Sequence, residues 1–212
     1  RNMVTQRTFG TLPSGEEVQI YHLENKSGAF AEVLQFGAIL VKLCVPDRDG
    51  RLTDVVLGYD DLAGYEVNGC FFGATIGRSG NRIAQSRFTL DGKEIVLTPN
   101  EGANNLHSGP DGYSSRKWSS EIVEDERGLA VRFSLISPDG DQGMPGELHI
   151  SAMYVLTEDD SVILEYEGVA GEDTIVNPTN HSYFNLAGHA SGTVYNQEMW
   201  LAAKEFTPSD SG

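Results

Sequence analysis

Short apolar stretches separated by turn residues make up most of the chain, and their spacing is that of strands rather than helices. Residues 16–23 (EEVQIYHL) and 29–45 (AFAEVLQFGAILVKLCV) are rich in Val, Ile, Leu and Phe, and Gly37 interrupts the second stretch. A turn at 46–50 closes this region, because proline and glycine punctuate extended segments. Helix-period patterning is weak, so we predict strands here.

The later stretches follow the same pattern. Asp91-Gly92 stands between two alternating apolar runs in 87–97 (RFTLDGKEIVL), the strongest short signal for a β-hairpin. The acidic pair at 60–61 is consistent with one helical turn. Further strands are predicted at 117–123, 128–137, 147–156, 161–169 and 200–206, the last of which leads into a turn at 207–212.

This element pattern predicts the fold class. Many short strands separated by turns, with no repeat and no linker, indicate an all-β protein: a large antiparallel β-sandwich in a single domain over 1–212. Alternation within 147–156 sends His149 to the less buried face of its strand. We assign no chemical role to His149 or to His22.

Composition narrows the function. The 212 residues carry 15 basic and 31 acidic side chains, a net charge of −16, which argues against nucleic acid and anionic membranes as partners. No apolar run is long enough to span a membrane or to serve as a signal peptide, so we expect a cytoplasmic protein. Cys44 and Cys70 lack metal-ligand spacing, and we expect reduced thiols buried in strands and no metal site.

The stretch 176–188 (VNPTNHSYFNLAG) is the strongest candidate for chemistry. It surrounds His181 with asparagine, serine, threonine and tyrosine side chains. A core strand would not bury so many polar groups, because each one costs free energy if it is left unpaired. We therefore interpret it as a half-buried polar cleft around a titratable imidazole, with a hydrogen-bonded structural histidine in a turn as the alternative.

A second candidate is 71–83 (FFGATIGRSGNRI), in which three glycines surround Arg78, Asn81 and Arg82. The glycines match neither common phosphate-loop pattern. They indicate closely packed backbone that lets a guanidinium fork face a cleft. The alternative, an arginine that bridges strands through backbone carbonyls, applies to Arg78 more than to Arg82.

A third candidate lies in the irregular polar loop 100–109 (NEGANNLHSG). His107 stands near its end, between Leu106 and Ser108, in another polar and closely packed setting. On its own it would more often be a surface histidine.

Three motifs, GRSGNRI, NNLHSG and NPTNHSYFNLAG, occur in the order and rough spacing of the aldose 1-epimerases, and the chain resembles this family over almost its whole length. The resemblance implies a galactose mutarotase-like β-sandwich whose concave face holds a free hexose, with no metal or organic cofactor. It implies that His181 is the general acid at the ring oxygen, that His107 assists there, and that Arg82 and Asn81 bind the sugar. Ser108 departs from the family pattern, since a glycine is common at that position, and Ser79-Gly80 replaces a bulkier pair.

The chemistry agrees with these roles. Mutarotation opens a cyclic hemiacetal, rotates the aldehyde and recloses the ring, so a base removes the anomeric hydroxyl proton while an acid protonates the ring oxygen. An imidazole, with an ordinary pKa of about 6.5, can exchange protons in both directions near neutrality. Positioned proton transfer typically accelerates a reaction roughly 10²–10⁴-fold.

The resemblance also implies a general-base glutamate and a sugar-binding aspartate beyond residue 212. We expect the chain to be the first three-fifths of an epimerase, truncated at its C-terminal side. Alone it should be inactive and poorly soluble, with the remainder of the polypeptide needed to complete the site. Two alternatives remain open: a non-catalytic carbohydrate-binding module, and a hexose-6-phosphate 1-epimerase that uses Arg78, Arg82 and Arg87.

Overall fold

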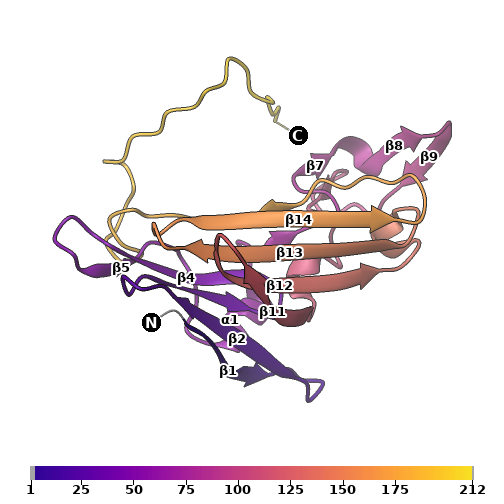
Figure 1. Cartoon of the computed structure of the whole chain (residues 1–212). Coiled ribbons are helices and arrows are strands. Elements are labelled where there is room, and N and C mark those ends of the chain that lie inside the picture. Colours follow the sequence, from indigo (N-terminus) through magenta and orange to yellow (C-terminus); the bar gives the residue numbers. More distant parts are fainter. Residues whose placement is uncertain (1–2, 212) are drawn as a thin grey trace.

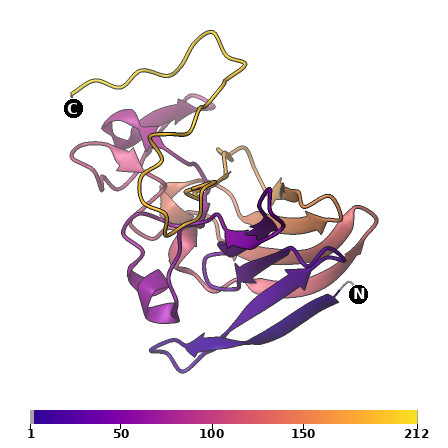
Figure 2. The ribbon, with the colours of Figure 1, turned by 90° about the vertical axis from the view of Figure 1, so that its left-hand side faces the viewer.

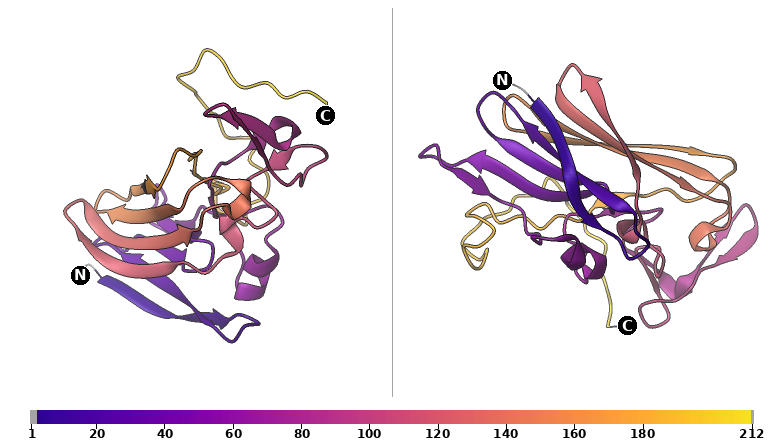
Figure 3. Two further views of the ribbon diagram at one scale, coloured as in Figure 1. Left: turned by 90° about the vertical axis from the view of Figure 1, so that its right-hand side faces the viewer. Right: turned by 90° about the horizontal axis from the view of Figure 1, so that it is seen from below.

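Two antiparallel sheets form the body of the protein, which we describe from a computed structural model covering residues 3–211 (Figure 1). The first sheet has five strands in chain order: β1 (Met3–Thr11), β2 (Glu17–Glu24), β3 (Phe30–Leu34), β4 (Ile39–Pro46) and β5 (Leu52–Asp54). The second has four: β11 (Ser119–Asp125), β12 (Gly128–Ser137), β13 (Leu148–Thr157) and β14 (Val162–Ala170). Figures 1 and 3 show the indigo-to-purple strands of the first sheet lying along one side of the pink-to-orange strands of the second.

The main core lies between these sheets, because alternate side chains of each strand point toward the other sheet. It includes Tyr21 and Val33 of the first sheet and Phe133 and Tyr154 of the second, all buried. The rings of Tyr21 and Phe133 meet edge to face at 6.0 Å. The expected all-β sandwich is therefore confirmed.

The other face of the five-stranded sheet is covered as well. Ile20 and Ile39 pack there against α1 (Leu62–Val67) and β6 (Thr75–Ile76). Helix α1 begins after Asp61, whose carboxylate accepts a hydrogen bond from the backbone N–H of Gly64 at 3.0 Å. The single helical turn expected beside the acidic pair is thus this short helix, and a sheet buried on both faces gives a rigid base for the loops above it.

Three small two-stranded sheets carry those loops. Strand β7 (Arg82–Ile83) pairs with β10 (Asn105–Leu106), and β15 (Thr179–Asn180) pairs with β6. Strands β8 (Arg87–Leu90) and β9 (Lys93–Val96) form the predicted hairpin, with Asp91 and Gly92 both at positive φ in its turn. The 3-10 helices are η1 (Ala84–Ser86), η2 (Tyr113–Ser115) and η3 (Asp141–Gly143).

Two predictions of local structure were wrong. Residues 200–206 are not a strand, and Figure 2 shows this yellow segment standing away from the large sheets. Trp200 is 85 % exposed, and among residues 3–211 no strand pairs with the segment through ladder hydrogen bonds. The turn expected at 207–212 is also absent as far as residue 211, and Gly212 lies outside the described residues.

A third correction concerns a thiol. Cys44 is buried in β4 as expected, but Cys70 is exposed and lies in a turn rather than in a strand. Its neighbours Gly69 and Phe71 belong to the loop that turns from α1 toward β6. Within residues 3–211, no helix has both the length and the apolar character needed to cross a membrane.

Candidate active site

The glycine-rich segment 77–82 lies between the two histidine loops and is bonded to both. On one side, the backbone N–H of Asn177 donates to the Arg78 carbonyl at 2.7 Å, and the N–H of Gly80 donates to the Asn177 carbonyl at 2.9 Å. On the other side, the Ser108 hydroxyl accepts from the N–H of Ser79 at 2.9 Å and donates to its carbonyl at 3.0 Å. Three motifs that are far apart in the sequence therefore meet through this one segment.

This arrangement brings the two predicted histidines together. The rings of His107 and His181 have centroids 5.1 Å apart, with planes at 90°. The backbone N–H of His181 donates to the Ala74 carbonyl at 2.8 Å, which fixes its segment beside β6. Phe71 contacts both imidazoles, at 5.0 Å from His107 and 5.5 Å from His181, and Tyr183 lies 5.3 Å from His181.

The protonation of His107 follows from its contacts. The backbone N–H of Asn81 donates to Nδ1 of His107 at 2.9 Å, so we assign the proton of the neutral ring to Nε2. Burial lowers the pKa of His107, and the nearby charges of His181 and Arg82 lower it further, while Glu101 acts in the opposite direction. His107 is therefore a neutral imidazole at pH 7 that presents Nε2–H as a hydrogen-bond donor.

Arg82 and Asn81 stand beside this imidazole at the start of β7. Nε and Nη2 of Arg82 donate to the Glu101 carboxylate at 2.7 and 2.8 Å, and Nη1 donates to Oδ1 of Asn81 at 3.2 Å. The hydrogen bonding between these two side chains raises the pKa of Arg82 and lowers the pKa of Glu101. Both groups are ionised across the neutral range, and the guanidinium is held on one edge.

All four predicted site residues, His181, His107, Arg82 and Asn81, line one cavity of about 690 Å³. This volume lies within the range of small-molecule sites. Phe71 contributes an apolar wall, and the imidazoles, amides and guanidinium supply hydrogen-bonding groups. Among the described residues that line the cavity there is no aspartate or glutamate, so a carboxylate base opposite His181 is not among them.

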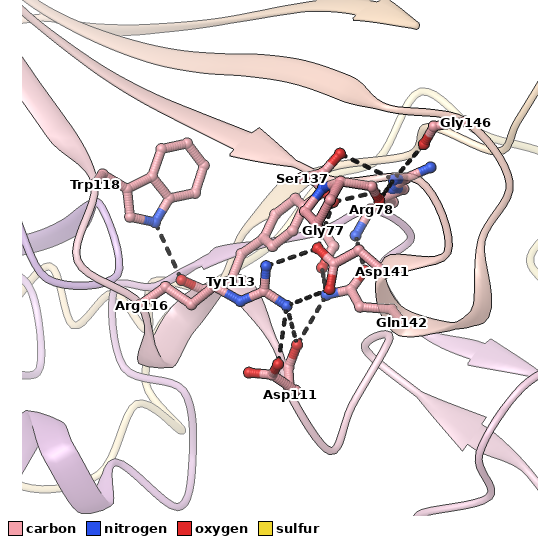
Figure 4. Close-up of polar contacts among 11 residues, drawn as sticks. Gly77, Arg78, Asp111, Tyr113, Arg116, Trp118, Ser137, Asp141, Gln142 and Gly146 are labelled. Carbon is pink, nitrogen blue, oxygen red and sulfur yellow. Dashed lines mark hydrogen bonds and ion pairs between the residues drawn. The ribbon is translucent and has the colours of Figure 1, made fainter. Parts of the chain in front are cut away.

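Arg78 is not among the described residues that line the cavity, and Figure 4 shows its guanidinium between Ser137 and Gly146. Its side chain is completely buried and makes six hydrogen bonds, four to backbone carbonyls and two to hydroxyls. The Gln142 carboxamide bonds both the N–H of Arg78 and the carbonyl of Gly77, each at 3.0 Å. The alternative of a strand-bridging arginine is confirmed, and the interpretation of Arg78 as a cleft donor was wrong.

The same close-up shows how this buried arginine joins a wider network. Asp141 accepts from the Ser137 hydroxyl, and it forms a two-pronged ion pair with Arg116 at 2.7 and 2.8 Å. Arg116 in turn lies over the ring of Tyr113, 5.3 Å from its centroid. These contacts fix the Arg78 end of the segment 77–82. The other end, which carries Asn81 and Arg82, therefore extends from an immobile backbone.

Two residues of the site escaped the sequence analysis. Phe71 touches both imidazoles and has a positive φ of 57°, but in the sequence only its place in a glycine-rich segment is evident. Glu101 was read as loop, although it is the only charged residue in NEGANNLHSG. That isolated charge, close in sequence to His107, was the signal available for an ion-pair partner of Arg82.

The fold and the cleft together define a class of protein, a β-sandwich with a small-molecule-sized cavity built around two imidazoles and a guanidinium. Comparison with known proteins gives the family. The chain belongs to the aldose 1-epimerase family, whose model matches residues 19–212.

Individual relatives agree with this assignment. The chain is 42 % identical over 208 residues to galactose mutarotase from Bos taurus, and 38 % identical over 205 residues to aldose 1-epimerase from Escherichia coli. These matches cover 98 % and 97 % of this chain but 59 % and 58 % of the relatives, so the chain spans about three-fifths of their length.

Solved structures show the same fold. The crystal structure of galactose 1-epimerase from Lactobacillus acidophilus superimposes with a TM-score of 0.78 at 28 % identity, covering 88 % of this chain and 54 % of that one. An aldose epimerase homologue from C. elegans gives a TM-score of 0.72 at 37 % identity, covering 79 % of this chain and 50 % of that one.

Proposed function

We propose that the protein is an aldose 1-epimerase, an isomerase that interconverts the α and β anomers of a free hexose such as galactose or glucose. The observation that carries the proposal is the meeting of two imidazoles, 5.1 Å apart, with Arg82 in the wall of one cavity. Galactose mutarotases and aldose 1-epimerases among the relatives support the same reaction. The partner is a small uncharged sugar.

In this mechanism His181 protonates the ring oxygen as the bond between that oxygen and the anomeric carbon breaks. Its ring has no hydrogen-bond partner among residues 3–211, so its nitrogens are available to a ligand. His107 donates its Nε2–H to the same oxygen or to a neighbouring hydroxyl, because its lowered pKa keeps it neutral. Arg82 donates to sugar hydroxyls, and the Asn81 carboxamide donates to or accepts from them.

The base that removes the anomeric proton is, in our proposal, a carboxylate outside these 212 residues. One observation supports this: the described cavity wall contains no carboxylate. The 212-residue chain should then bind sugar weakly and leave the mutarotation rate near its spontaneous value. Full-rate mutarotation by this chain, purified and verified by mass, would refute the assignment of the base.

Polarimetry on freshly dissolved α-galactose or α-glucose tests the function in the intact protein. We expect His181→Ala to reduce the catalysed rate roughly 10²–10⁴-fold, because a positioned proton donor is lost. His149→Ala is the matched control, since His149 is exposed and bonds only to Glu147 at 2.7 Å among the described residues. Equal loss in both variants, or no loss in His181→Ala, would contradict the proposal.

The two competing functions make different predictions. A carbohydrate-binding module would bind the sugar in calorimetry without accelerating mutarotation. A hexose-6-phosphate epimerase would need a basic cluster, but Arg78 is buried away from the cavity and Arg87 pairs with Glu94 on the hairpin. Of the three arginines considered for phosphate, only Arg82 lines the cavity, which favours an uncharged substrate.

A further inference from the structure

The charge of the cavity wall is concentrated in one pair of side chains. Arg82 is the only residue with a full charge at neutral pH among the described residues that line the cavity. The carboxylate of Glu101 forms an ion pair with Arg82 and accepts two hydrogen bonds from it, of 2.7 and 2.8 Å. The cavity wall therefore contains a guanidinium whose positive charge is balanced by a neighbouring carboxylate.

The carboxylate is held in place by its own loop. The backbone N–H of Glu101 donates to the Asn104 carbonyl at 3.1 Å, and the N–H of Asn104 donates back to the Glu101 carbonyl at 2.9 Å. Two residues further on, Leu106 in β10 pairs with Arg82 in β7. Arg82 thus lies in this small sheet, and the backbone of Glu101 is bonded to the residue that precedes β10.

The geometry also limits which N–H groups a ligand can reach. A guanidinium has five N–H groups, and in Arg82 two of them serve Glu101 and one serves Asn81. Two donors remain, enough to hydrogen-bond neutral hydroxyls. A phosphate or carboxylate would favour the paired, charge-assisted edge that Glu101 already occupies.

We propose that Glu101 is a specificity-determining residue that makes the cavity select uncharged aldoses over anionic sugars such as hexose 6-phosphates. It does so by occupying the charge-binding edge of Arg82 and by placing a negative charge next to this residue of the cavity wall. This inference rests on the proposed function, since it assumes that Arg82 faces a sugar. The net charge of −16 adds to the repulsion of anionic ligands.

A purely structural role for this ion pair is a different hypothesis. The side chains of Arg82 and Glu101 are 51 % and 39 % exposed, and exposed pairs contribute little to stability. Loss of the pair should therefore leave the melting temperature nearly unchanged while it changes ligand preference. A structural role would instead alter stability and reduce turnover of all sugars alike.

The test uses Glu101→Gln in the intact protein, which keeps the side-chain shape and removes the charge. The matched control is Glu94→Gln, which removes the carboxylate from the exposed Arg87–Glu94 pair on the neighbouring hairpin. Mutarotation of α-glucose and of glucose 6-phosphate is followed by polarimetry, and kcat/KM is measured for each after subtraction of the spontaneous rate.

In Glu101→Gln we expect kcat/KM for the phosphorylated sugar, relative to the free sugar, to rise about tenfold, chiefly through a lower KM. This is the size expected when one screened charge is removed several ångströms from a dianion. In Glu94→Gln the ratio should change less than about twofold, because its charge is not at the cavity.

The outcomes separate the two proposals. An unchanged ratio in Glu101→Gln, or an equal rise in Glu94→Gln, overturns the role of Glu101 and leaves the proposed function intact. If the unaltered protein accelerates neither sugar, the proposed function fails, and the role of Glu101 fails with it.

Discussion

Ser108 offers the most direct test of how the site is assembled. Its side chain is 1 % exposed, and its hydroxyl both accepts from the N–H of Ser79 and donates to the Ser79 carbonyl. Neither backbone group of Ser79 bonds another described residue. Removing the hydroxyl therefore leaves two buried polar groups unpaired in the middle of the segment that joins the histidine loops.

The backbone of Ser108 adds a second effect. Its φ is 56°, in the left-handed region that glycine adopts freely and other residues adopt at a cost of about 1–2 kcal/mol. Ser108→Ala loses the hydroxyl and keeps this cost. Ser108→Gly loses the same hydrogen bonds but removes the backbone cost, so the two variants separate the contributions.

The expected magnitudes follow from these contacts. Leaving a buried backbone group unpaired costs about 1–3 kcal/mol, so Ser108→Ala should lower the free energy of unfolding by about 3 kcal/mol. In a domain of this size that corresponds to a fall of about 6–12 °C in Tm. Ser108→Gly should be about 1 kcal/mol less destabilising than Ser108→Ala, because of its freer φ.

Thermal and urea unfolding followed by circular dichroism measure these differences. Ser151→Ala is the matched control, since Ser151 lies partly exposed on the outer face of β13 and should change stability by less than about 0.5 kcal/mol. The reasoning is wrong if Ser108→Ala is as stable as the control, or if Ser108→Gly is the less stable of the two Ser108 variants.

Three further predictions follow from the same structure. At pH 8 a thiol reagent should label exposed Cys70 and spare Cys44, because burial raises the pKa of the Cys44 thiol to about 11. A bound sugar should slow the labelling of Cys70, because Cys70 lines the cavity, and peptide mass mapping measures both effects. NMR titration should give His107 a pKa below the ordinary imidazole value of about 6.5. The contribution of neutral His107 to stability is therefore fully present above about pH 6.5 and is lost as the pH falls through the lowered pKa. A titration midpoint at or above the ordinary value would contradict the burial argument. Arg78→Lys should destabilise the fold by about 3 kcal/mol or more, because an ammonium cannot replace six hydrogen bonds, whereas Arg87→Lys on the exposed hairpin should be nearly neutral in urea unfolding.

Periodicity predicted most strands of the two large sheets, but not β1 or β5. The alternation in 147–156 gave the correct faces of β13, with His149 outward, and Asp91-Gly92 identified its hairpin, because both signals arise from local backbone geometry. The stretch 200–206 has the same apolar content but is not a strand. A strand forms only when a neighbour supplies ladder hydrogen bonds, and that condition is not written in the segment itself.

The sequence likewise predicted one part of the candidate site and missed another. Motif order identified His107, His181, Arg82 and Asn81 as candidates, and the structure brings all four to one cavity. The ion pair between Arg82 and Glu101 was missed, because it depends on the pairing of β7 with β10 rather than on spacing along the chain.

The two arginines of GRSGNRI show why residue type alone does not determine such roles. Arg78 and Arg82 are four residues apart in one glycine-rich segment, yet the first is completely buried and the second is half exposed. What differs is the supply of acceptors: Arg78 meets four backbone carbonyls from the turns around η3, while Arg82 meets a carboxylate on a loop. A guanidinium whose hydrogen bonds go to fixed carbonyls immobilises the backbone that carries it, and the rest of the same segment can then position Asn81 and Arg82 on a rigid base. The buried Arg78 thus affects the cavity by fixing the position of Arg82. For this reason Arg78→Lys should, besides destabilising the fold, break the 2.9 Å hydrogen bond between Asn81 and His107. That loss would be visible as a change in the NMR titration of His107.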